Sequence, residues 1–167
     1  MLGDYLHYGL LAALAIALVV AAATDWRRRQ IDNWLNLAIA IGAPIYWLAR
    51  PMPLWASFPE PSVGAQLLVA LAAFAVFATF FALKWMGGGD VKLLTALALW
   101  IEPEWFLRLL LIMGVVGGVL TIALGAWHVT RRRRDKLAIP YGVAIAIAGL
   151  WVLGVHYLPA AQLTLVG

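Results

Sequence analysis

Residues 63–84, VGAQLLVALAAFAVFATFFALK, contain no charge before Lys84 and are long enough to cross a bilayer as one helix. Similar runs follow along the chain, so that 65% of the 167 residues are hydrophobic and only 12% are charged. A soluble domain carries about 25% charged residues and has no core large enough for so much apolar surface. Disorder is excluded because it requires low hydrophobicity and high charge. The composition therefore predicts an integral membrane protein.

Apolar segments of this kind predict an all-α fold, a polytopic membrane bundle of about six transmembrane helices. The segments are 5–24, 34–50, 63–84, 90–101, 105–129 and 137–156. Short loops join them, and we expect residues 1–167 to form a single membrane-embedded domain. The run at 21–23 resembles a signal-peptide cleavage site, but the preceding segment carries Asp4 and no basic residue, which favours an uncleaved first helix. The Gly114 and Gly118 pair is interpreted as packing within the bundle.

The basic residues divide unequally between the two sides that six helices define. One side receives Arg27, Arg28, Arg29, Lys84, Lys92, Arg131, Arg132, Arg133, Arg134 and Lys136. The other side receives Arg50 and Arg108. The positive-inside rule places the larger set in the cytoplasm and both termini outside it. The run at 131–134 is thus interpreted as a topological anchor, and we expect membrane lipid, and no nucleic acid, as a partner.

Metal and thiol chemistry have little support in the sequence. The chain has 0 cysteines. Its histidines, His7, His128 and His156, are far apart and lack the paired spacing of metal ligands. We therefore expect no metal site, and we interpret each histidine as a buried residue at a helix end.

Two acidic residues lie at the predicted cytoplasmic ends of helices. Asp25 ends the first segment, and Asp90 begins the fourth directly after Gly87-Gly88-Gly89. Alternate helices run in opposite directions, so both carboxyls belong to the same face. From Asp90 to the next turn the fourth segment spans roughly 18 Å, whereas the hydrocarbon core is about 30 Å thick. We expect Asp90 to lie in a recess below the surface, with Lys92 extending to the surface.

Three motifs lie in order at helix boundaries on this face. Residues 87–90 match GxGD, and residues 25–33, DWRRRQIDN, match D-x-R-x-x-x-I-P-N except that Asp32 replaces the proline. Residues 139–142, IPYG, match the proline-containing start of a last helix. In these motifs the chain resembles the type IV prepilin peptidases, which are GxGD intramembrane aspartyl proteases. Its small size resembles the branch that serves Flp-type (tight adherence) pili and lacks a methyltransferase portion.

The resemblance implies an aspartic endopeptidase of the bacterial inner (cytoplasmic) membrane, which removes the short basic leader from prepilins or pseudopilins at the cytoplasmic face. It makes Asp25 and Asp90 the catalytic pair and requires no cofactor. The supporting residues that it implies are Gly87, Gly89, Lys92, Arg27, Asn33, Pro140 and Tyr141. Two carboxyls in a confined site do not both ionise readily, so one is expected to hold a proton while the other activates water. Which carboxyl is the base stays open, as does the oligomeric state.

Other interpretations remain at this point. A small proton-coupled transporter would use the same acids as a relay, although transporter sites typically lie near the bilayer midplane. A structural subunit of pilus assembly would leave Asp90 without a purpose. Asp32 is expected to be an N-cap whose side chain bonds free N–H groups near Trp34. Because the basic loops would not attract a basic leader, we expect backbone and apolar contacts to dominate substrate docking.

Overall fold

The computed structural model describes residues 2–56, 61–130 and 139–157. Every regular element within these ranges is a helix. The elements are α1 (Leu2–Arg28), α2 (Asn33–Ala49), α3 (Val63–Ala82), α4 (Gly88–Ala98), α5 (Pro103–Thr130), α6 (Tyr141–Val152) and a short π-helix, η1 (Leu153–Tyr157). The predicted all-α bundle of six helices is confirmed for this part of the chain. The expected start of the last segment at residue 137 lies outside the described residues.

The helices differ in how much of a bilayer they can cross. The stretches Tyr5–Arg28, Val63–Ala82 and Pro103–His128 are long and apolar enough to span a membrane. With 17 residues, α2 extends over roughly 25 Å at 1.5 Å per residue. With 11 residues, α4 extends over only about 16 Å and is much shorter than the hydrocarbon core. The chain is therefore a multi-pass membrane protein with one short internal helix.

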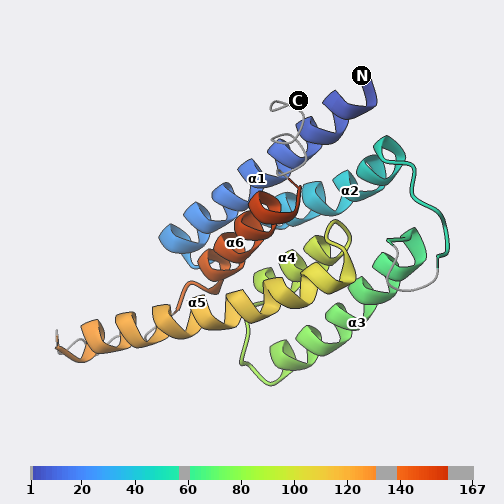
Figure 1. Ribbon diagram of the computed structural model, residues 1–167. Helices are drawn as coiled ribbons and strands as arrows, with labels where there is room; N and C mark the ends of the chain where they lie inside the picture. The colour runs from blue at the N-terminus through green and yellow to red at the C-terminus, as the bar shows by residue number, and fades with distance from the viewer. Residues whose placement is uncertain (1, 57–60, 131–138, 158–167) are drawn as a thin grey trace.

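The short helix α4 lies inside the bundle (Figure 1). It packs against α2, α3, α5 and α6, while α6 lies between α1 and α5. The buried residues of α4 are Asp90, Val91, Leu93, Leu94, Ala96, Leu97 and Ala98. Because lipid is as apolar as leucine, helices in a membrane associate through close packing rather than through the hydrophobic effect. The packing of α4 on its neighbours carries its first turn, with Asp90, into the protein.

Two turns with left-handed backbone set the direction of the chain at one end of the bundle. Arg29 follows α1 with φ 55°, and Lys84 follows α3 with φ 61°. The N–H of Arg29 donates to the carbonyl of Asp25 at 2.9 Å, which closes the last turn of α1. A non-glycine residue in this conformation costs about 1–2 kcal/mol. These turns lead into the connections that precede α2 and α4, so both of these helices begin at the same end.

The opposite ends of α2, α4 and η1 are joined by polar contacts. Trp47 Nε1 donates to the carbonyl of Leu99 at 3.0 Å. Glu102, just after α4, lies 3.4 Å from an Arg50 guanidinium nitrogen and 3.2 Å from His156 Nε2. The helices α2 and α4 are therefore parallel neighbours that polar contacts join at this end.

The packing of α5 corrects one expectation from the sequence. Gly114 and Gly118 are exposed, and a Cβ added at either would meet, within 4 Å, no described atom beyond the backbone of its own helix. The interpretation of this pair as packing within the bundle is therefore wrong. The glycine that packs is Gly117, where an added Cβ would lie 3.3 Å from the Tyr141 ring and 3.7 Å from Ala144 of α6.

Candidate active site

A polar recess of about 390 Å³ lies where the connection from α1 to α2 meets the connection from α3 to α4. Its lining residues are Asp25, Arg29, Gln30, Ile31, Asp32, Asn33, Gly87, Gly88, Gly89 and Asp90. The two acids from α1 and α4 therefore share one recess, as their positions at helix ends predict. The two carboxyls interact electrostatically, and they repel each other when both are charged.

Asp25 lies near the end of α1 and is 6% exposed. Its Oδ2 accepts a hydrogen bond from the N–H of Gly142 at 2.8 Å. Gly142 is the second residue of α6, whose N-cap is Pro140, a residue without a side-chain acceptor. The first N–H groups of a helix have no partner within that helix. The Asp25 carboxylate thus takes the place of a capping side chain for α6.

Asp90 is the third residue of α4 and is 9% exposed. The backbone of the N-cap residue Gly87 interacts with the Asp90 carboxyl. An acid three residues after the N-cap commonly makes this contact in a capping box. Both recess carboxyls are therefore held at helix N-termini, which attract negative charge. Asp25 lies at the start of α6, and Asp90 lies at the start of its own helix.

The glycines allow the backbone to approach the acids closely. A Cβ added at Gly142 would lie 2.8 Å from Asp25 Oδ2 and 2.9 Å from Ile31 Cδ1. At Gly89 it would lie 3.1 Å from Ile31 Cβ, and at Gly87 it would lie 3.0 Å from Asp90 Oδ2. No described glycine has a positive φ. Close contact, rather than an unusual backbone conformation, is the reason for glycine at these positions.

Some of the other site residues predicted from the sequence lie at or beside the recess, and others lie away from it. Lys92 is exposed, as expected, and its Nζ donates to Asn33 Oδ1 at 2.8 Å, so that the starts of α2 and α4 are joined beside the recess. Arg27 is exposed and does not line the recess, whereas Arg29 does. Pro140 is buried as the N-cap of α6, and Tyr141 packs on α5 rather than in the recess.

The expectation for Asp32 is only half right. Asp32 is the N-cap residue of α2, but its side chain makes no capping hydrogen bond. Its backbone carbonyl instead accepts from the N–H groups of Leu35 at 3.2 Å and Asn36 at 3.3 Å. The prediction of a side-chain cap near Trp34 is therefore wrong, and Asp32 lines the recess together with the two other acids.

Sequence reasoning did not select Gly142, Ile31 or Arg29 as site residues. Gly142 holds Asp25, and Ile31 fills the space between Gly142 and Gly89. The sequence contains one signal for Gly142. A proline at the start of a helix offers no side-chain acceptor, so the free N–H groups that follow it need an acceptor from elsewhere in the fold. Among the described residues, no three histidine, aspartate or glutamate side chains are placed to hold a metal ion.

The fold and the recess define a polytopic membrane protein with a pair of buried carboxyls at one end of the bundle. Residues 12–122 match the type IV leader peptidase family. The chain belongs to this family. The matched range includes Asp25 and Asp90 and ends before α6.

Two curated relatives from different bacteria share one name, prepilin leader peptidase/N-methyltransferase. The prepilin leader peptidase/N-methyltransferase of Xanthomonas campestris pv. campestris is 30% identical over 146 residues, which cover 84% of this chain and 47% of the relative. The protein of that name from Aeromonas hydrophila is 30% identical over 149 residues, which cover 87% of this chain and 49% of the relative. The chain thus spans about half the length of these relatives. No solved structure gives a significant match. These similarities give no support to the transporter interpretation.

Proposed function

We propose that the protein is an aspartic endopeptidase that removes the leader from prepilins or pseudopilins. The observation that carries this proposal is the convergence of Asp25 and Asp90 in one recess, each at a helix N-terminus. Membership of the type IV leader peptidase family supports it, as do the names of the relatives. The described helices act as one membrane-embedded peptidase domain.

The chemistry follows from two adjacent carboxyls of which one holds a proton. The ionised carboxylate takes a proton from a water molecule, whose oxygen attacks the scissile carbonyl carbon. The protonated carboxyl donates a hydrogen bond to the carbonyl oxygen as negative charge develops there. When the tetrahedral intermediate collapses, the C–N bond breaks and a carboxyl delivers a proton to the leaving amine. Either residue fits either role, because two coupled carboxyls titrate as a pair.

We further propose that the recess opens to the cytoplasm from the bacterial inner membrane, with both termini outside the cytoplasm. The positive-inside rule supports this orientation, because Arg27, Arg28, Arg29, Lys84 and Lys92 flank the recess end of the bundle. A prepilin has a short basic leader before an apolar helix, so its cleavage site lies at the depth of this recess. We propose a prepilin of the Flp type as the substrate, which is the class of pilus that the resemblance of the sequence implies.

The test is cleavage of candidate prepilins by the purified protein in detergent. Asp25→Asn and Asp90→Asn should each lower the cleavage rate by about 100-fold or more, because general acid–base groups contribute roughly 10²–10⁴-fold. Asp32→Asn is the matched control, since it changes a third acid of the same recess and should retain most activity. Full processing by either Asp25→Asn or Asp90→Asn would overturn the assignment.

A further inference from the structure

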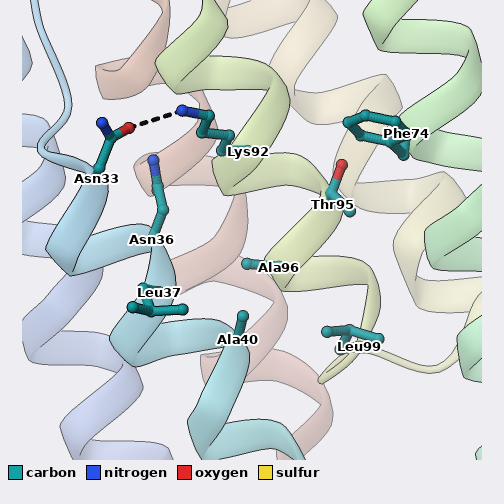
Figure 2. Close-up of a pocket in the computed structure, with 9 residues that line it drawn as sticks. All are labelled: Asn33, Asn36, Leu37, Ala40, Phe74, Lys92, Thr95, Ala96 and Leu99. Carbon is teal, nitrogen blue, oxygen red and sulfur yellow. Dashed lines mark hydrogen bonds between the residues drawn. The ribbon is translucent and has the colours of Figure 1, made fainter.

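A second cavity, of about 410 Å³, lies beside the recess and faces α2, α3 and α4 (Figure 2). Its lining residues are Asn33, Asn36, Leu37, Ala40, Phe74, Lys92, Thr95, Ala96 and Leu99. We call it the α2–α4 groove. Asn33 lines both the groove and the recess, so the groove adjoins the proposed active site.

The groove is built from matching faces of two parallel helices. On α2 its residues are 33, 36, 37 and 40, and on α4 and its C-cap they are 92, 95, 96 and 99. Both sets have the i, i+3, i+4, i+7 spacing of a single helix face. The groove therefore follows the helix axes for roughly 10 Å, at 1.5 Å per residue. Its recess end is polar, with Asn33 and Lys92, and its far end is apolar, with Ala40 and Leu99.

One polar atom in the groove lacks a partner. Asn36 is 4% exposed, and its Nδ2 donates to the carbonyl of Gly89, next to Asp90, at 3.4 Å. Its Oδ1 makes no hydrogen bond to any residue that the structure describes. Buried polar atoms in native proteins are almost always paired, so this acceptor is available to a donor from a molecule bound in the groove.

The apolar helix of a substrate supplies such a donor. The first four N–H groups of a helix lack partners within it, and the hydrocarbon core offers them no water. A helix that begins at the recess and runs along the groove presents these N–H groups beside Asn36, while its side chains meet Leu37, Ala40 and Leu99. A lipid acyl chain has no hydrogen-bond donor and leaves Asn36 Oδ1 unpaired.

We propose that the α2–α4 groove binds the apolar helix that follows the scissile bond of the substrate, and that Asn36 Oδ1 accepts a hydrogen bond from the first turn of that helix. This inference rests on the proposed peptidase function. It names Asn36 as a positioning residue and the groove as the surface that selects an apolar helix rather than a soluble peptide.

The first test fills the groove. Ala40→Phe places a ring inside it, whereas Ala38→Phe, the matched control, places the same ring on an exposed position of α2 that does not line the groove. With a full-length prepilin that the unchanged protein cleaves, Ala40→Phe should raise KM about tenfold at similar kcat, because one well-packed apolar side chain contributes that much to binding. Equal kinetics for the two variants would overturn the proposal.

The second test asks whether the helix lies in the groove. Because the chain has 0 cysteines, Thr95→Cys provides a single reactive position. In an Asp90→Asn background, oxidation should form a disulfide with cysteines placed in the first two turns of the prepilin helix. Ala38→Cys should form none. Absence of the Thr95→Cys product, together with lipid that native mass spectrometry finds on the unchanged protein and not on Ala40→Phe, would assign the groove to lipid and overturn the proposal.

Asn36→Leu separates substrate positioning from structure. It should raise KM by roughly fivefold, the value of about one hydrogen bond. Tm should change little, because the substitution removes the unpaired buried acceptor together with the long Nδ2 hydrogen bond to Gly89, at 3.4 Å. A lower Tm with unchanged KM would show that Asn36 serves only the fold. If the unchanged protein cleaves no prepilin, the peptidase proposal itself fails, and this outcome is distinct from equal kinetics of the groove variants.

Discussion

Asp25 and Asp90 line the same recess, but different parts of the fold hold their carboxyls. Asp90 interacts with the backbone of Gly87, at the start of its own helix. Asp25 interacts with the N–H of Gly142, so that its position depends on a helix more than a hundred residues later in the chain. The Asp90 carboxyl is therefore held within its own helix, whereas the Asp25 carboxyl joins α1 to α6. Substitutions that disturb the two sides should therefore have unequal effects.

The largest effect on this comparison is expected from Gly142→Ala. The new Cβ would lie 2.8 Å from Asp25 Oδ2 and 2.9 Å from Asp25 Cβ, so that α1 and α6 must separate. A displacement of about 1 Å at a catalytic group lowers a rate by roughly 100-fold. Prepilin cleavage measured at saturating substrate should fall by that order.

Two further alanines serve as controls for Gly142→Ala. Gly87→Ala meets only the end of the Asp90 side chain, at 3.0 Å, and should lower the rate less. Gly118→Ala meets nothing within 4 Å and should leave the rate unchanged. If Gly87→Ala proved more harmful than Gly142→Ala, the Asp25 side would not be the more demanding one.

The helices of this fold are accessible to sequence reasoning for a physical reason. In lipid every backbone polar group must be paired within the protein, so long apolar runs form helices almost regardless of their neighbours. Their alternating direction then places Asp25 and Asp90 at one end of the bundle. The shortness of α4 follows from the spacing between Asp90 and the turn at Glu102, which the structure confirms.

The orientation of each helix about its axis is not accessible in the same way. Apolar residues surround α5 on all sides, so the sequence does not show that Gly117, rather than Gly114 or Gly118, faces α6. The contact of Gly142 with Asp25 depends on α6 packing beside α1, which no local pattern encodes. Asp32 shows the limit of local rules, because it occupies the predicted cap position while its side chain does not cap the helix.

The difference between the two carboxyls should also appear in the free energy of unfolding of variants that lack one of them. Asp25→Leu leaves the buried N–H of Gly142 without an acceptor, which costs about 1–3 kcal/mol of unfolding free energy. Asp90→Leu removes a carboxyl that interacts with the backbone of Gly87, and it should cost less because Gly87 is exposed and water can pair its N–H. Asp25→Asn retains an oxygen acceptor and should stay close to the unchanged protein. Reversible unfolding in mixed micelles checks the order, which equal losses for the two leucine variants would contradict.

The smallest expected effect concerns the surface beside Asp90. Lys92→Met removes the hydrogen bond to Asn33 that joins α4 to α2, and this exposed contact contributes about 0.5–1 kcal/mol to stability. Arg27→Met is the matched control, because it removes one basic charge from the same end of the bundle at an exposed position outside the recess. Unfolding in mixed micelles should show a lower free energy for Lys92→Met than for Arg27→Met. Equal values would mean that α4 keeps its place through its buried packing on the neighbouring helices, and that the Lys92–Asn33 hydrogen bond does not help to fix the Asp90 side.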